Sequence, residues 1–210
     1  DEKQKTEAAL GCKKLLLEKG IAINEYNSEG IAKDLNALKK ELNYDRWNVY
    51  AVSYGTYIAQ VYASLFPNDI TSLVLDSSID DITTYYTENT ENYMNSLRKV
   101  FNICVNDEEC NAEYPKLEET YYKVISDLKE NPITVSVDKN LVASGSFTFN
   151  SEDFKIVIQQ ALYNKQLVEV IPLLINQFEA KNKDALGSLV AAFSSLLQMD
   201  YGVYYCISCN

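Results

Sequence analysis

The pentapeptide Ala51-Val52-Ser53-Tyr54-Gly55 constrains the fold of this chain more than any other feature. Residues 47–52 form a short apolar run rich in aromatic and β-branched side chains, which predicts a buried strand of a parallel sheet. Residues 54–66 place apolar side chains at helical spacing, and Pro67 predicts the end of that helix. The serine is therefore expected at a sharp turn between a strand and a helix.

A serine at such a turn has its hydroxyl pushed above the sheet, which is the geometry of a nucleophile elbow. We expect Ser53 to be a nucleophile, with the small Ala51 and Gly55 avoiding collisions with neighbouring backbone. The backbone amide of Tyr54, at the helix N-terminus, is expected to donate to an oxyanion. A second oxyanion donor is expected on a loop that precedes Asp1 in a longer protein.

A second strand is predicted over residues 71–75, and its connection to the first strand through a helix makes a βαβ unit. Asp76 follows at the carboxyl end of this strand. It has two interpretations, a catalytic acid or an ordinary turn and cap aspartate, and the second is preferred because aspartate often serves turns. The predicted fold class is α/β, with a parallel sheet flanked by helices.

The remaining pattern is mostly helical. Upstream, one helix is expected over residues 5–19, ending at Gly20, and another from Ser28 to about Asn43. Downstream, Ser151 is expected to cap one of the later helices. The downstream segments are helices over 84–104, 112–130, 153–163, 166–180 and 184–198, a hairpin of 133–137 with 146–149, and a strand over 202–206. Three regions follow: a core over 1–83, a mainly helical cap insertion over 84–198, and a return to the core sheet over 199–210.

Composition excludes several classes of function. The chain has 210 residues, 47% of them hydrophobic, which is typical of a globular protein. Its net charge of −11 argues against nucleic acid as a partner, because like charges repel. No apolar run is long enough to span a membrane. The chain also contains no histidine, so it lacks the usual base that activates a serine.

Five cysteines permit disulfides, and Cys104 with Cys110 could close a small loop. Cys206 and Cys209 have two weaker interpretations. A zinc site would need two further ligands, and a thioredoxin-type redox pair would stand at a helix start rather than at the end of a strand. We therefore predict structural cysteines, no metal and no cofactor. The cysteine content, together with the habit of the family named below, favours a location outside the cytoplasm.

Residues 47–56, together with Phe66-Pro67 and residues 72–77, resemble the α/β-hydrolase peptidases of the tripeptidyl aminopeptidase and prolyl aminopeptidase family. The likeness is strong over residues 10–80. It extends upstream through Cys12, Gly20-Ile21, Tyr26-Asn27-Ser28, residues 32–35 and Leu42. In the insertion it is carried by layout and by Cys104, Cys110 and Tyr114-Pro115, and after the insertion by residues 202–206.

This resemblance implies an α/β-hydrolase core with a helical cap, and a serine exopeptidase that forms an acyl-enzyme on Ser53. It also implies a catalytic acid and a histidine after the cap, which we expect beyond Asn210. The chain is accordingly expected to be an incomplete segment, with negligible turnover by itself. A peptide is the expected substrate, and a small ester is the close alternative. The competing hypothesis is a catalytically inactive binding module on the same scaffold.

Overall fold

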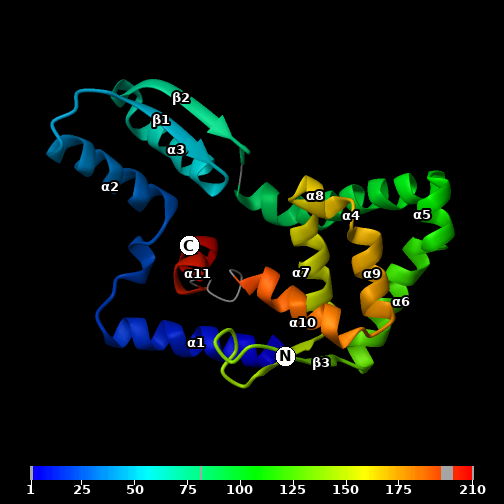
Figure 1. The fold of residues 1–210 in the computed structure, drawn as a ribbon. Helices are drawn as coiled ribbons and strands as arrows, with labels where there is room; N and C mark the ends of the chain where they lie inside the picture. The colour runs from blue at the N-terminus through cyan, green and yellow to red at the C-terminus, as the bar shows by residue number, and fades with distance from the viewer. Residues whose placement is uncertain (1, 81, 195–200, 210) are drawn as a thin grey trace. The chain divides into compact units, whose positions relative to one another are not determined.

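The structure is a computed structural model that describes residues 2–80, 82–194 and 201–209 (Figure 1). Contacts between residues divide the chain into two units. The first comprises residues 1–88 with 200–210, and the second comprises residues 89–199. Each unit is described by itself.

The centre of the first unit is a βαβ unit. Strand β1 (Trp47–Val52) pairs in parallel with strand β2 (Ile70–Asp76), and Val52 lies opposite Asp76 in the register. Helix α3 (Tyr54–Leu65) and a short 3-10 turn, η2 (Pro67–Asp69), connect the two strands. The predicted strand, serine turn, helix and second strand are all confirmed, with ends within two residues of those expected.

Two further helices precede this unit in the chain. Helix α1 (Glu2–Glu18) is followed by a turn at Gly20, whose φ of 73° lets the amides of Gly20 and Ile21 bond back to the last turn of the helix. A short 3-10 turn, η1 (Ile23–Glu25), leads to helix α2 (Ser28–Glu41), which packs against α3. Both predicted helices are confirmed, although the side chain of Asn27 provides the N-terminal cap of α2.

The prediction that β1 is a buried strand is wrong for this structure. Tyr50 and Val52 are 65% and 49% exposed, and Val74 of β2, on the same face, is 53% exposed. Helix α3 contacts both strands, and Ala51, which points to the opposite face from Tyr50 and Val52, is buried. The sheet is therefore covered on one face and open on the other among the described residues.

The predicted strand over residues 202–206 is also wrong. These residues belong to helix α11 (Tyr201–Cys209), which contacts α1 within the first unit. A short run of aromatic and β-branched residues does not by itself distinguish a strand from one segment of a packed helix.

The second unit is mainly helical, with one antiparallel hairpin (Figure 1). The hairpin consists of β3 (Ile133–Ser136) and β4 (Ser146–Phe149), and Gly145 adopts a φ of 72° in its connection. The helices are α4 (Ile82–Asn106, which begins in the first unit), α5 (Glu108–Glu113), α6 (Leu117–Glu130), α7 (Ser151–Leu162), α8 (Lys165–Val168), α9 (Ile171–Glu179) and α10 (Lys183–Ala192).

Four details of this unit differ from the prediction. The cap of α7 is Asn150 rather than Ser151, and Asp153 completes a capping box by accepting the amide of Asn150. The single helix predicted over 166–180 is two helices, because Pro172 occupies the first turn of α9. The helix predicted over 112–130 begins only at Leu117, because α5 ends at Glu113 and a break over residues 114–116 follows. The helix predicted over 184–198 ends at Ala192, and residues 195–198 lie outside the described residues. The helices predicted over 84–104 and 153–163 and the hairpin are confirmed.

Aromatic side chains fill the core of the second unit. Phe154 and Phe178 are at most 1% exposed and meet edge to face, with ring centroids 4.8 Å apart. Phe149 of the hairpin meets Phe178 in the same way at 5.3 Å. Such contacts add to the burial of large apolar surfaces, so this unit has a hydrophobic core of its own.

Candidate active site

Ser53 has the most unusual backbone in the βαβ unit. Its φ and ψ are 54° and −129°, a combination that residues with a Cβ rarely adopt. Such a conformation costs about 1–3 kcal/mol and persists only where surrounding contacts hold it. The serine thus stands on a sharp, strained turn between β1 and α3, as the sequence predicts.

Hydrogen bonds hold the backbone of Ser53 on both sides. Its amide donates to the carbonyl oxygen of Asp76 at 3.0 Å, which continues the ladder between β1 and β2. Its carbonyl accepts from the amide of Thr56 at 2.9 Å and from the Thr56 hydroxyl at 2.7 Å. The side chain of Ser53 is exposed and makes no hydrogen bond within the described part of the chain. Its hydroxyl is therefore available to an incoming group.

Tyr54 is the first residue of α3, so its amide lies at the positive end of the helix dipole. Its side chain reaches back to α2, where the phenol oxygen lies 2.9 Å from the Ser28 hydroxyl. The placement agrees with the expected oxyanion donor, and that role stays a prediction.

Ala51 and Gly55 flank the turn. Ala51 is 8% exposed, and a larger side chain there would have to displace its neighbours. A Cβ on Gly55, in contrast, would meet no atom within 4 Å. Gly55 instead lines an apolar groove of about 510 Å³, bordered by β1, by α3 and by Ile31 and Leu35 of α2. Gly55 was expected to avoid a collision with neighbouring backbone, but no backbone atom from another segment of the described residues lies within that distance of such a Cβ.

Asp76 is at the end of β2, beside the strand end that carries Ser53. Its carboxylate accepts from the Tyr50 hydroxyl at 2.6 Å and from the Ser77 hydroxyl at 3.2 Å. The bond to Asp76 raises the pKa of Tyr50, because ionising the phenol would remove the donor and repel the carboxylate. Among the described residues both donors to the Asp76 carboxylate are hydroxyls, and the sequence contains no histidine for it to orient. Neither donor is a backbone amide, so these two bonds do not make Asp76 a turn cap, and both interpretations of Asp76 stay predictions.

A polar cluster that the sequence did not reveal lies at the start of β2. Asp69 accepts from Lys39 Nζ at 2.7 Å, Asn36 Nδ2 at 2.7 Å and the Tyr62 hydroxyl at 2.9 Å. The bond from Lys39 is the main cause of the lowered pKa of Asp69, while burial and Asp69 together raise the pKa of Tyr62 to about 12. The cluster joins α2, α3 and η2, and every polar side chain in it has a partner. We assign it a structural role.

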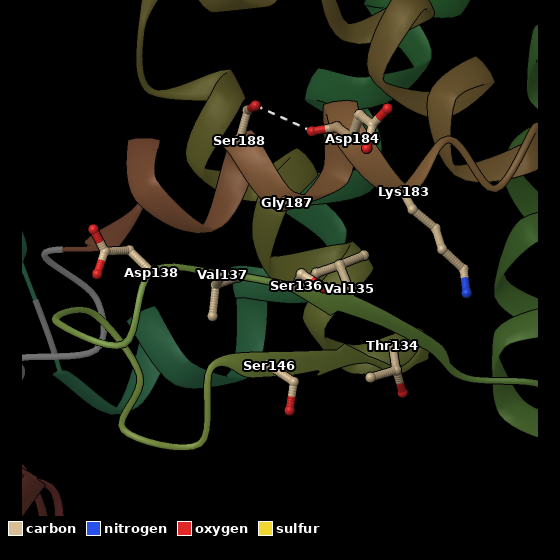
Figure 2. Close-up of a pocket in the computed structure, with 10 residues that line it drawn as sticks. All are labelled: Thr134, Val135, Ser136, Val137, Asp138, Ser146, Lys183, Asp184, Gly187 and Ser188. Carbon is tan, nitrogen blue, oxygen red and sulfur yellow. Dashed lines mark hydrogen bonds between the residues drawn. The ribbon is translucent and has the colours of Figure 1, made fainter.

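The second unit holds a separate cavity of about 620 Å³ between the hairpin and α10 (Figure 2). Helix α10 approaches the hairpin closely, since a Cβ on Gly187 would lie 2.9 Å from the carbonyl oxygen of Ser136. The hydroxyl of Ser188 donates to the carbonyl of Asp184 in its own helix, as the dashed line in Figure 2 marks. Among the residues that line this cavity, no serine hydroxyl is hydrogen-bonded to a base. The cavity therefore lacks the pair of groups needed for nucleophilic catalysis.

Cys104 and Cys110 form a disulfide, which confirms that this pair closes a small loop. Cys12 and Cys206 are free, and the side chain of Cys209 lies outside the described residues. Cys206 and Cys209 lie in the second half of helix α11 and not at the end of a strand. A thioredoxin-type redox pair would stand at a helix start, so this position still does not suit one. No group of three possible metal ligands occurs among the side chains that the structure describes. Within the same residues, no helix is long and apolar enough to cross a membrane.

Curated proteins with similar sequence include an aminopeptidase and a serine protease. The tripeptidyl aminopeptidase of Streptomyces lividans is 33% identical over 61 residues, which are 29% of this chain and 11% of that protein. The serine protease Hip1 of Mycobacterium tuberculosis is 38% identical over 50 residues, 24% of this chain and 10% of that protein. The similar segment thus spans about a tenth of the length of these relatives.

The family described as the alpha/beta hydrolase fold matches residues 4–109, half of the chain. The match contains the whole βαβ unit, with Ser53 at its turn and Asp76 at the end of its second strand. A parallel sheet with a helical crossover is the arrangement expected of this fold class. The chain belongs to the alpha/beta hydrolase fold family.

Proposed function

We propose that this chain carries the nucleophile of a serine exopeptidase, with Ser53 as the attacking residue. The observation that carries the proposal is the strained backbone of Ser53 beneath an exposed hydroxyl that has no hydrogen bond within the described residues. Similarity to a tripeptidyl aminopeptidase and to a serine protease supports a peptide as the substrate.

In the proposed reaction, the Ser53 oxygen attacks the scissile carbonyl carbon and the hydroxyl proton passes to a base. The amide C–N bond then breaks, the leaving amine takes that proton, and water later hydrolyses the acyl-enzyme. The Tyr54 amide stabilises the oxyanion at the helix N-terminus. A histidine base would have to come from outside these 210 residues, because they contain none.

We further propose that the second unit acts as the cap. It is built mainly of helices, has its own aromatic core, and is inserted in the sequence between two parts of the first unit.

The disulfide between Cys104 and Cys110 supports a location outside the cytoplasm, where such bonds persist. Mass spectrometry of protein from its native source, with free thiols alkylated before digestion, tests this location. Finding both cysteines alkylated would contradict it.

A fluorophosphonate probe tests the nucleophile. The oxygen of an activated serine displaces fluoride from the probe, so the longest gene product containing this chain should be labelled at Ser53. The variant Ser53→Ala should lose the label, whereas Ser72→Ala, which removes an exposed hydroxyl from β2, should keep it. Equal labelling of wild type and Ser53→Ala, or no labelling of the wild type, would refute the assignment.

Two other functions predict different results. A carboxylesterase would be labelled in the same way but would hydrolyse a small ester and leave peptides intact. An inactive binding module would remain unlabelled, even as the longest gene product.

A further inference from the structure

Thr56 is the most completely buried polar residue near Ser53. It occupies the third position of α3 and is 0% exposed. Its hydroxyl donates to the carbonyl of Ser53 at 2.7 Å and accepts from the amide of Ile79 at 2.9 Å. A hydroxyl has one proton to donate, so Thr56 directs that proton to the turn while it holds a backbone group of another segment.

The segment that Thr56 holds follows β2. Ile79 lies three residues after Asp76, and its carbonyl accepts from Gln60 Nε2 at 2.6 Å. Gln60 also donates to the carbonyl of Thr56 at 3.1 Å, one turn back in α3. Both backbone groups of Ile79 are therefore bound by side chains of α3, and the exit from β2 is tied to the helix that begins at Ser53.

The peptide that Thr56 binds is the one that joins Ser53 to Tyr54. A peptide group is planar and trans, so its carbonyl and its amide point in opposite directions. Holding the Ser53 carbonyl toward the Thr56 hydroxyl and amide fixes the direction of the Tyr54 amide on the opposite side. That amide is the oxyanion donor of the proposed function, and small misplacements of such a group reduce rates strongly.

We propose that Thr56 is a positioning residue, which orients the Tyr54 amide through the Ser53 carbonyl and is itself held in place by Ile79 and Gln60. This inference rests on the proposed function, since it requires Ser53 to be the nucleophile. A threonine that only bonds back to its own helix would need just the bond from its hydroxyl to the Ser53 carbonyl. The additional bonds to Ile79 make the orientation of the turn depend on the segment after β2.

The test measures the labelling of Ser53 by the fluorophosphonate probe in the longest gene product, and separates its rate constant from its final extent. Replacing Thr56 by Val removes the hydroxyl at nearly constant volume, and should lower the rate constant about 10- to 100-fold while the extent stays complete. Thr56→Ser restores the hydroxyl and should recover the rate to within about fivefold. Thr71→Val, at an exposed position in β2, is the matched control and should react as the wild type.

Three results would overturn the inference while leaving the nucleophile assignment intact: a wild-type rate in Thr56→Val, a reduced extent with an unchanged rate constant, or no rescue by Thr56→Ser. The second of these would show a structural role, because misfolding removes sites without slowing those that remain. If Thr56→Val does not fold, Gln60→Met decides, with an expected decrease of about threefold or more at full extent. Absence of labelling in the wild type refutes the proposed function instead, and the inference with it.

Discussion

The strain at Ser53 predicts an unusual order of stabilities for two variants of this chain. Ser53→Ala keeps a Cβ at a φ of 54° and therefore keeps the strain. Ser53→Gly removes the Cβ, and glycine adopts positive φ readily. We expect the glycine variant to be the more stable of the two, which is the reverse of the usual order in folded segments.

The expected difference is about 1 kcal/mol. Relief of the backbone strain contributes about 1–3 kcal/mol in favour of glycine. The greater freedom of glycine in the unfolded chain opposes this by about 0.4–1 kcal/mol. Loss of the hydroxyl is common to both variants and cancels. With a typical urea dependence, the midpoint of unfolding should rise by roughly 0.5 M from the alanine to the glycine variant.

Trp47 provides the assay. It is the single tryptophan of the chain, it lies in β1, and its ring centroid is 5.6 Å from that of Tyr62 in α3. Its fluorescence in urea therefore reports the unfolding of the βαβ unit. The matched control is the pair Ser72→Ala and Ser72→Gly, at an exposed position inside β2 where φ is not positive.

At Ser72 the glycine variant should be less stable than the alanine variant, by about 0.5–1 kcal/mol. If Ser53 shows that same ordinary order, then the turn is not strained in solution. The argument that links its geometry to a nucleophile would then fail.

Three further predictions concern stability. Asp69→Asn should destabilise the first unit by about 3 kcal/mol, because Lys39 keeps a nearly buried charge without its ionised partner. The pKa of Asp69 is lowered in the folded state, so the ion pair should stabilise the wild type above a pH of about 4 and lose this effect as the pH falls further. A pH titration of Trp47 emission would show this loss. Gly187→Ala should lower the thermal midpoint of the second unit in circular dichroism, because overpacking costs about 1–3 kcal/mol. Reducing the disulfide between Cys104 and Cys110 should destabilise that unit by about 2 kcal/mol in urea titrations followed by circular dichroism.

Each of these predictions has its own control. Glu29→Gln removes an exposed ion pair of α2 and should change stability by less than about 1 kcal/mol, so an equal loss in both variants would contradict the burial argument. Gly11→Ala, where a Cβ meets nothing within 4 Å, should not destabilise. Cys12→Ser removes an exposed free thiol and should leave the destabilisation by reductant unchanged. If the reductant no longer destabilises the Cys12→Ser variant, the disulfide prediction is wrong.

The βαβ unit could be predicted from the sequence because its signals are local. The apolar run of β1, the helical spacing of α3 and the stop at Pro67 each act over a few residues. The strained turn could be predicted for the same reason, since one short motif contains the strand end, the serine and the helix start.

Predictions failed where neighbours distant in sequence decide the outcome. Residues 202–206 carry a pattern that suits a strand, yet they pack as a helix against α1. The cluster around Asp69 joins side chains up to 33 residues apart, and no spacing in the sequence marks it. The exposure of Tyr50 likewise depends on what covers the sheet, which the composition of the strand does not encode.

The geometry of the turn also bears on the choice between an enzyme and an inactive binding module. The backbone of Ser53 is held by Thr56 and Asp76, which belong to the same βαβ unit, so the strained conformation forms without any histidine. A glycine would satisfy that backbone without the strain, and no hydrogen bond within the described residues uses the Ser53 hydroxyl. Packing therefore gives no reason for a serine at a position where a Cβ costs about 1–3 kcal/mol. Nucleophilic chemistry does give one, because a strained turn presents the oxygen above the sheet, and this favours the serine hydrolase over the binding module.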